Sequence, residues 1–468
     1  MTHASALLNK ISASKETIGI IGLGYVGLPL AVGFAQAGIK VIGFDKSAKK
    51  VDNINHGNNY IKDIRDAVLR EVVDNITLSA TIDFTRMKEC DALLICVPTP
   101  LDKFRKPDMS YIEAACIAIG QNMKPGTFIC LESTTYPTTT EEFMLPLIEE
   151  ASKENPFNRT KAQSNNDNNY NNDNLTPSQP ASSTLSFKHG IDFWLAYSPE
   201  RVDPGNASFH TKNTPKVLGA ITPEGLEIGE KIYSKAIDHL HLVSSPKVAE
   251  MVKILENTYR LINISLINEL ALLAGKMGID IWEVIEAAKT KPFGFQAFYP
   301  GPGIGGHCIP LDPFYLEHIA KKFNFDLSMI NTAGHIDMMM PHRMTIKITT
   351  ALNRQERAIN GSKILFLGIA YKPDIDDERE SPALKIIDEV AKKGGLVSYH
   401  DPYIATIVAG NTTYQSATLS EENLKEADCV VITTNHSIFD IDFIVKNSKL
   451  IVDLRNAVKT ASKNVYKL

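Results

Sequence analysis

Residues 17–45 read TIGIIGLGYVGLPLAVGFAQAGIKVIGFD. An apolar strand, a glycine-rich turn, an apolar helix and a second apolar strand follow one another, which is how a doubly wound parallel sheet begins. Gly22, Gly24 and Gly27 form the pattern G-x-G-x-x-G at the turn, where the backbone can bring a pyrophosphate onto the helix N-terminus. Asp45 ends the second strand, where a carboxylate accepts ribose hydroxyls and disfavours a 2'-phosphate. The segment therefore predicts NAD binding, with glycines that only pack a tight turn as the alternative.

Further apolar runs extend this sheet and begin a second one. Three of them precede or reach residue 200, at residues 92–97, 127–132 and 193–197. Residues 247–289 lack proline and carry apolar residues near helical spacing, which predicts a long helical region. Four more strand-like runs follow, at residues 363–368, 396–400, 429–433 and 450–454. We expect an α/β protein with two Rossmann-like doubly wound domains, at 16–242 and 341–468, joined by a central helical region at 243–340.

The composition excludes several classes of protein. The 468 residues are 44% hydrophobic and 22% charged with a net charge of −5, which is typical of soluble globular chains. The chain has no long basic run of the kind that would indicate a nucleic-acid or membrane partner. We also expect no membrane-spanning segment and no signal peptide, because no apolar segment is long enough to cross a bilayer and the N-terminus lacks an apolar core. The six cysteines form no C-x-x-C pair and most lie in apolar runs, which predicts reduced core thiols and favours a reducing cytoplasm. They are Cys90, Cys96, Cys116, Cys130, Cys308 and Cys429. Residues 162–186 are rich in Asn, Ser and Pro and predict a disordered surface insertion, with a recognition arm as the alternative.

A second constellation lies at residues 300–312, which read PGPGIGGHCIPLD. Glycines allow close approach to a ligand, and a thiol in such a loop can reach the thiolate form that attacks carbon. Cys308 is therefore a candidate nucleophile. The adjacent His307 is interpreted as a loop-shaping residue rather than as its catalytic partner.

A third candidate is a polar helix face. Lys253 and Asn257 are four residues apart within the predicted helical region, with Glu250 and Arg260 nearby. A solvated face that does nothing further is the alternative, because charged residues at helical spacing usually face water.

Taken together these motifs resemble the UDP-sugar dehydrogenase family, which includes the UDP-glucose and UDP-N-acetylhexosamine 6-dehydrogenases. The resemblance covers nearly the whole chain outside the Asn-rich insertion, in the order GLGYVGLPLA, VPTP, LESTTYP, YSPERVDPG, AEMVKILENT, GPGIGGHCIPLDP and AYKPDIDDERESP. It implies an N-terminal NAD domain, a central helical region that makes a homodimer or higher oligomer, and a C-terminal UDP-binding domain.

The resemblance also implies the reaction and its residues. Carbon six of the sugar is oxidised twice with NAD, and the second step passes through a thiohemiacetal and a thioester on Cys308. Lys253 and Asn257 match positions that stabilise the oxyanion and hold the sugar, and Asp312 and Thr134 match positions that orient a water. Glu200 matches the carboxylate assigned to thioester hydrolysis, with a strand-end ion pair as the alternative.

Ligand positions carry over in the same way, and no metal is implied. The NAD positions are Gly22, Gly24, Tyr25, Val26, Gly27, Asp45, Lys50, Thr99, Thr134 and Arg379, where Lys50 replaces a more usual arginine. The sugar and UDP positions are Glu200, Arg201, Lys253, Asn257, Tyr299, Gly303, Lys372 and Arg455.

One departure bears on the substrate. Glucose-oxidising relatives usually carry lysine one position before the aspartate of the cysteine loop, whereas this chain has Leu311. This loop and KPFGF at residues 291–295 look most like UDP-N-acetylglucosamine dehydrogenases. UDP-N-acetylmannosamine, UDP-N-acetylgalactosamine and UDP-glucose remain alternative substrates. A one-step hydroxyacid-type dehydrogenase and a non-catalytic nucleotide-sugar-binding protein are the rival functions.

Overall fold

The computed structural model describes residues 2–62, 64–100, 106–158, 185–203, 206, 208–306, 309–460 and 462–468. Residues 162–184 of the predicted insertion lie outside the described residues. His307 and Cys308 also lie outside them. The chain divides into two compact units, Met1–Ile254 and Leu255–Leu468, and the boundary falls inside the long helix α9 (Pro246–Met277).

Unit 1 is built on an eight-stranded sheet of order β3-β2-β1-β4-β5-β6-β7-β8. The strands are β1 (Thr17–Ile21), β2 (Lys40–Phe44), β3 (Leu78–Thr81), β4 (Ala92–Ile95), β5 (Thr127–Leu131), β6 (Phe193–Tyr197), β7 (Lys216–Ala220) and β8 (Leu240–Val243). All neighbouring pairs are parallel except β6 and β7, which are antiparallel. The carboxyl end of β6 and the amino end of β7 therefore meet at the same edge of the sheet.

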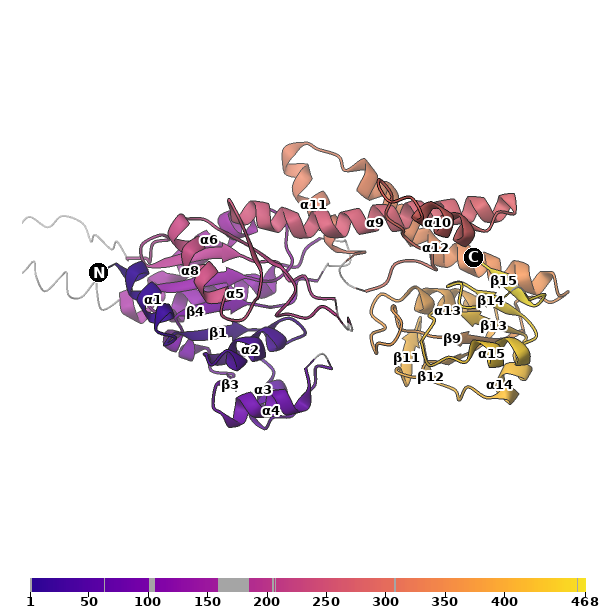
Figure 1. The fold of residues 1–468 in the computed structure, drawn as a ribbon, viewed down its shortest axis with the longest axis horizontal. Coiled ribbons are helices and arrows are strands. Elements are labelled where there is room, and N and C mark those ends of the chain that lie inside the picture. The colour runs from indigo at the N-terminus through magenta and orange to yellow at the C-terminus, as the bar shows by residue number, and fades with distance from the viewer. Residues whose placement is uncertain are drawn as a thin grey trace, which may run out of the picture. The chain divides into compact units, whose positions relative to one another are not determined.

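Helices cover both faces of this sheet, as Figure 1 shows. They are α1 (His3–Ser12), α2 (Gly27–Gln36), α3 (Ala48–Asn55), α4 (Asp66–Asp74), α5 (Ser110–Asn122), α6 (Leu145–Ala151) and α8 (Pro223–Tyr233), with short turns η1 (Phe84–Glu89), η2 (Thr139–Met144) and η3 (Ser152–Glu154). Alternate strand residues enter two cores: Ile20 and Leu94 face one, and Ile21 and Ile95 face the other. Burial on both faces is why these strands read as continuous apolar runs.

Unit 2 contains a five-stranded parallel sheet of order β10-β9-β13-β14-β15. Its strands are β9 (Lys363–Leu367), β10 (Leu396–His400), β13 (Cys429–Ile432), β14 (Ile451–Asp453) and β15 (Val465–Lys467), beside a hairpin of β11 (Thr406–Ala409) and β12 (Thr412–Gln415). Its helices are α10 (Ile281–Lys289), α11 (Asp312–Ala320), α12 (Ser328–Asn353), α13 (Pro382–Lys392), α14 (Glu421–Glu426) and α15 (Ile441–Asn447), with the turn η4 (Lys321–Phe323). The predicted fold class, two Rossmann-like sheets with a central helical region, is confirmed.

The predicted helical region at 247–289 is broken once. Gly278 ends α9 with a positive φ of 72°, and Ile279 N–H donates to the Ala274 carbonyl, which closes the helix end. Asp280 then begins α10 by accepting from the N–H groups of Trp282 and Glu283. Residues 247–289 contain no proline, and Gly278 ends the first helix instead, which the expectation of one helical region did not include.

Among the described residues, five cysteines are free and buried, in agreement with the prediction of reduced core thiols: Cys90, Cys96, Cys116, Cys130 and Cys429. Burial raises the pKa of the Cys90 thiol to about 12, which keeps it protonated and unreactive. The described residues include no helix that is both long and apolar enough to cross a membrane.

The break after α9 can be tested with two glycines three residues apart. A Cβ at Gly275 or at Gly278 would meet no atom within 4 Å, but only Gly278 has a positive φ. Gly278→Ala should lower the free energy of unfolding by about 1 kcal/mol because alanine disfavours that backbone. Gly275→Ala should raise it by roughly 0.5 to 1 kcal/mol because alanine suits a helix. The measurement is the denaturant midpoint, and equal shifts in both variants would contradict this account of the break.

Candidate active site

The glycine turn after β1 has the geometry of a dinucleotide loop. Gly22 has a φ of 93°, and a Cβ at Gly27 would lie 1.9 Å from the Gly22 carbonyl oxygen, so both positions require glycine. A Cβ at Gly24 would meet nothing within 4 Å, so the backbone there faces open space. Tyr25 is exposed, and Val26 precedes α2 without a side-chain cap. Leu28 N–H donates to the Gly24 carbonyl at 3.0 Å and Pro29 has no N–H, so a pyrophosphate at this turn would meet chiefly the open backbone around Gly24.

Asp45 follows β2 beside this turn. Its carboxylate accepts from the N–H groups of Leu23 and Ser47 at 3.0 and 2.9 Å, and from Lys50 Nζ at 3.2 Å. These bonds fix the carboxylate at the strand end where ribose hydroxyls bind in such folds. The described residues thus fit NAD, which supplies a hydride acceptor when bound.

Thr99 and Thr134 lie on the loops that follow β4 and β5. Thr99 Oγ1 donates to the Thr134 carbonyl at 2.7 Å. Ser133 Oγ donates to the Val97 carbonyl at 2.6 Å and so adds a second bond between the same loops. Two predicted NAD positions are therefore joined at the carboxyl edge of the sheet.

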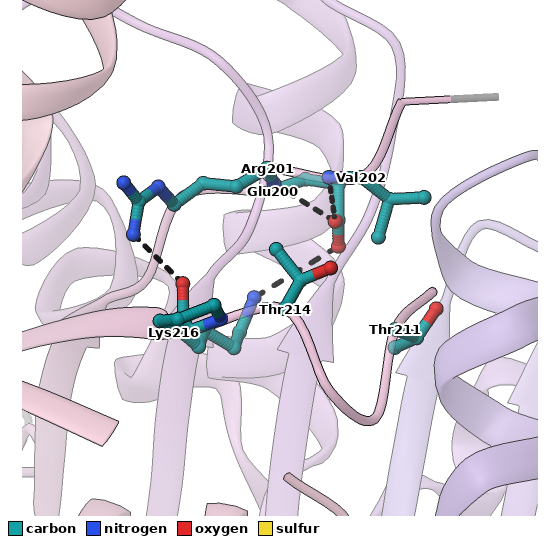
Figure 2. Close-up of a pocket in the computed structure, with 7 residues that line it drawn as sticks. Glu200, Arg201, Val202, Thr211, Thr214 and Lys216 are labelled. Atoms are coloured by element: carbon teal, nitrogen blue, oxygen red, sulfur yellow. Dashed lines mark hydrogen bonds and ion pairs between the residues drawn. The ribbon is translucent and has the colours of Figure 1, made fainter. Parts of the chain in front are cut away.

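Glu200 lies on the loop after β6 and lines a pocket with Arg201, Thr214 and Lys216 (Figure 2). Its Oε1 accepts from the N–H groups of Arg201 and Val202, each at 2.8 Å. Its backbone carbonyl accepts from Lys253 Nζ at 2.6 Å. Unit 1 thus brings together two predicted site residues that are 53 positions apart in the chain, Glu200 and Lys253.

Glu250 is a residue whose role sequence reasoning missed. Its fully buried carboxylate accepts from the N–H groups of Thr138 and Thr140 at 2.7 and 2.9 Å, and from Thr140 Oγ1 at 2.7 Å. Burial raises the pKa of Glu250 to about 7. The alternative of a solvated helix face is therefore wrong for Glu250, because this part of α9 is fastened to the loop that follows Thr134.

In unit 2, Asn257 and Asp312 form a buried pair. Asn257 Nδ2 donates to Asp312 Oδ2 at 2.5 Å, and both side chains are buried. Asp312 is the first residue of α11, where a carboxylate suits the helix dipole. The pair fixes the end of the predicted cysteine loop to α9.

The loop at residues 300–306 is held along its length by backbone bonds. Gly301 N–H donates to Asn268 Oδ1 at 2.9 Å, and Ile304 N–H donates to Asp337 Oδ1 at 2.7 Å. Gly303 has a φ of 134°, and Gly306 N–H donates to the Arg379 carbonyl at 3.0 Å. Described bonds therefore secure the chain on both sides of residues 307 and 308.

Two predicted UDP cations, Lys372 and Arg455, lie after strands of the second sheet. Lys372 lies on the loop after β9 together with Arg379, a predicted NAD position, whose guanidinium binds Asp377 in a bidentate pair. Arg455 follows β14, and its Nε donates to the Thr433 carbonyl at 2.9 Å. Arg455 forms no ion pair with a carboxylate of the described residues, and burial lowers its pKa to about 10. A partly buried cation without an internal counter-ion favours an anionic ligand.

Tyr299 precedes the glycine loop and is held from two directions. Its hydroxyl donates to Glu286 Oε1 at 2.7 Å and accepts from Lys289 Nζ at 3.2 Å. Its ring stacks on Trp282 with a centroid separation of 6.0 Å. In the parts of the chain that the structure describes, no cluster of His, Cys, Asp or Glu could hold a metal ion.

Three models of one protein family match successive parts of the chain. The NAD binding domain of the UDP-glucose/GDP-mannose dehydrogenase family matches residues 16–237. The central domain of the same family matches residues 247–338, and its UDP binding domain matches residues 365–460.

Individual relatives are similar over most of the chain. The UDP-N-acetyl-D-mannosamine dehydrogenase of Pyrococcus horikoshii is 33% identical over 448 residues, 94% of this chain and 96% of the relative. The UDP-N-acetyl-D-glucosamine 6-dehydrogenase of Pseudomonas aeruginosa is 32% identical over 389 residues, 83% of each chain. The solved structure of the UDP-D-ManNAc dehydrogenase from Pyrococcus horikoshii has a TM-score of 0.80 at 32% identity, covering 96% of this chain and 98% of that one.

The role of Asp45 predicts the effect of replacing it. Asp45→Ser should raise KM for NAD about tenfold and make NADP use measurable, because the variant loses the acceptor for ribose hydroxyls and leaves Lys50 to bind a 2'-phosphate. The measurement is the initial rate with each dinucleotide. Asp52→Ser is the control, since Asp52 is exposed on α3 and pairs only with His56 in the described structure. Unchanged selectivity in Asp45→Ser would contradict the assignment.

Proposed function

The chain belongs to the UDP-glucose/GDP-mannose dehydrogenase family and is an NAD-dependent UDP-sugar dehydrogenase. From that premise we propose that it oxidises carbon six of a UDP-N-acetylhexosamine twice, to the uronic acid. The substrate that we favour is UDP-N-acetylglucosamine. The observation that carries this proposal lies in unit 2. There the loop that contains Cys308 is fastened by Gly306 to the Arg379 loop and by Asp312 to Asn257.

The proposed chemistry balances over two oxidations. The carbon-six alcohol loses a hydride to NAD and a proton, which gives the aldehyde. The Cys308 thiolate then adds to the aldehyde carbon, and loss of a second hydride to a second NAD gives a thioester. Water adds to the thioester carbonyl, the carbon–sulfur bond breaks, and the carboxylate and the regenerated thiol result.

Each step has residues assigned to it within this proposal. Lys253 and Asn257 stabilise the oxyanion that develops when the thiolate or water adds to carbon. Asp312 and Thr134 orient the water for proton transfer. Glu200 removes a proton from the water that attacks the thioester. The bond between Asn257 and Asp312 supports this division, because it holds an amide donor and a carboxylate acceptor side by side.

Binding of the UDP moiety is assigned to unit 2. Arg455, which has no carboxylate partner among the described residues, and Lys372 meet the diphosphate or flank the base. Tyr299 and Gly303 contact the sugar or the nucleotide, and Arg201 of unit 1 is assigned to the same ligand. Gly301 lies directly against the Arg455 guanidinium, where a Cβ would come within 2.4 Å of its Nη1. Close packing of that kind orients the cation before the ligand arrives.

The sugar is assigned from the cysteine loop. Leu311 occupies the position at which glucose-oxidising relatives usually carry lysine, which favours an N-acetylhexosamine. Relatives named for mannosamine and glucosamine substrates are 33% and 32% identical, so overall identity does not separate the epimers. The product is assigned to surface polysaccharide precursor synthesis in the cytoplasm, where a reducing environment keeps Cys308 as a thiol.

Counting NADH tests this proposal. The intact protein should form about two NADH for each UDP-N-acetylglucosamine consumed, and more slowly or not at all with UDP-glucose. Cys308→Ala should reduce turnover about a thousandfold or more, because no thioester can form. Cys116→Ala is the matched control, since Cys116 is buried in α5. One NADH per sugar, unaffected by losing Cys308, would replace this proposal with a one-step alcohol dehydrogenase.

We further propose a homodimer through α9. Four exposed apolar side chains recur at three- and four-residue spacing, which forms one stripe on the helix: Leu266, Leu270, Leu273 and Met277. Contiguous exposed apolar surface of this kind marks an interaction site. A second copy of the chain can cover it about a two-fold axis, because the stripe is then packed against itself.

Charge placed on the stripe should break the dimer. Leu270→Glu combined with Leu273→Glu should weaken self-association about a hundredfold or more, because two apolar contacts are replaced by repelling charges. Light scattering coupled to size exclusion measures the mass across a dilution series. Val408→Glu, on the exposed hairpin strand β11, is the control. A monomeric wild-type protein, or a dimer that the double variant leaves intact, would refute this interface.

A further inference from the structure

A buried charge cluster lies directly behind Glu200 in unit 1. Lys216 Nζ lies 2.5 Å from Glu132 Oε2 and 3.9 Å from Glu200 Oε2, and donates to the Pro199 carbonyl at 3.3 Å. Glu132 also accepts from the hydroxyl of Tyr233. The side chains of Glu132 and Tyr233 are fully buried and that of Lys216 nearly so, whereas the Glu200 side chain retains 17% exposure. Glu200 is therefore the member of the cluster that reaches the pocket.

The topology of the sheet explains how this cluster forms. Glu132 is the first residue after β5, and Glu200 follows the neighbouring strand β6. Lys216 begins β7, which runs antiparallel to β6, so its amino end lies at the carboxyl edge of the other two strands. Only a strand that runs in this direction places its first residue beside Glu200. Figure 2 shows the Lys216 side chain extending toward the Glu200 carboxylate.

The two carboxylates of the cluster form different contacts. Burial alone would lower the pKa of Lys216, but Glu132 and Glu200 raise it, so the ammonium stays charged. Glu132 is the nearer partner and takes a second bond from Tyr233, which fixes the ammonium in place. Glu200 then has one oxygen bound by the N–H groups of Arg201 and Val202, while its other oxygen faces the fixed ammonium. Stability alone does not demand such a cluster, because apolar residues can replace buried ion pairs without loss.

We propose that Lys216, anchored by Glu132 and Tyr233, is a positioning residue that holds the Glu200 carboxylate in the orientation that its reaction with water needs. The inference rests on the proposed role of Glu200 in thioester hydrolysis. In that step Glu200 takes a proton from the attacking water, the water oxygen bonds to the thioester carbon, and the thiolate leaves. The ammonium touches neither sugar nor thioester and acts only through Glu200.

The test removes both buried charges together, so that no unpaired charge is left to unfold the protein. The variant Lys216→Met with Glu132→Gln is compared with wild type, with Lys216→Arg, and with the same pair of changes in a Glu200→Gln background. Rapid mixing of the intact enzyme with UDP-N-acetylglucosamine and NAD records the burst of NADH formed before hydrolysis and the steady rate after it. The exposed pair Lys231→Met with Glu227→Gln on α8 makes the same change in charge and is the matched control.

The double variant should keep the burst and the kcat/KM for sugar while its steady rate falls about tenfold or more, because only hydrolysis needs Glu200. Lys216→Arg should recover most of that rate. In the Glu200→Gln background the same changes should have no further effect, since the cluster acts through Glu200 alone. Losses that multiply in that background, or an unchanged steady rate, would overturn the inference. Wild type that forms no second NADH would instead overturn the proposed function itself.

Discussion

Backbone N–H groups just beyond the carboxyl end of a parallel strand have no partner in the neighbouring strand. A buried N–H without a hydrogen-bond partner lowers the stability of the fold. In both units a carboxylate accepts these groups from the loop that follows a strand: Asp45, Glu200, Asp401 and Asp453. The ligand-binding edge of each sheet is therefore shaped by acids that bind the protein's own backbone. Loops held in this way keep their side chains in place before any ligand is present.

This use of carboxylates also sets the charge that is left for ligands. Asp453 accepts from the N–H groups of residues 455, 457 and 458, so its oxygens are committed to backbone and not to the guanidinium of Arg455. Asp401 likewise accepts from the N–H groups of Ile369 and Ala370 at the start of the loop that carries Lys372, and His436 Nε2 forms a hydrogen bond with the same carboxylate. The Arg455 guanidinium is thus oriented by the Thr433 carbonyl without being neutralised by Asp453, as a diphosphate site requires.

Sequence reasoning found what local patterns encode and missed what depends on strand direction. The dinucleotide turn with Asp45 and most strand positions could be predicted, because glycine spacing and apolar runs are local signals. The position of Lys216 could not be predicted, because it lies beside Glu200 only when β7 runs antiparallel to β6, and nothing in residues 216–220 indicates that direction.

The burial of Glu250 could not be predicted for a related reason. Its partners lie 110 and 112 positions earlier, so helical spacing alone suggested a residue facing water. Of the proposed residues, Cys308 rests on sequence alone, since it lies outside the described structure.

The proposed double oxidation of one carbon constrains this protein more than a single oxidation would. An aldehyde that escapes after the first step is lost, so the chain must retain the sugar while the reduced cofactor is exchanged for a fresh one. In the proposed mechanism, a covalent bond to Cys308 meets that need during the second step. Non-covalent retention is favoured by the division of residues between the units. The dinucleotide turn and Asp45 lie in unit 1, whereas Lys372 lies in unit 2, as do Arg455 and the loop at residues 300–306 that packs against it. Exchange of the dinucleotide then leaves every proposed contact between UDP and unit 2 intact.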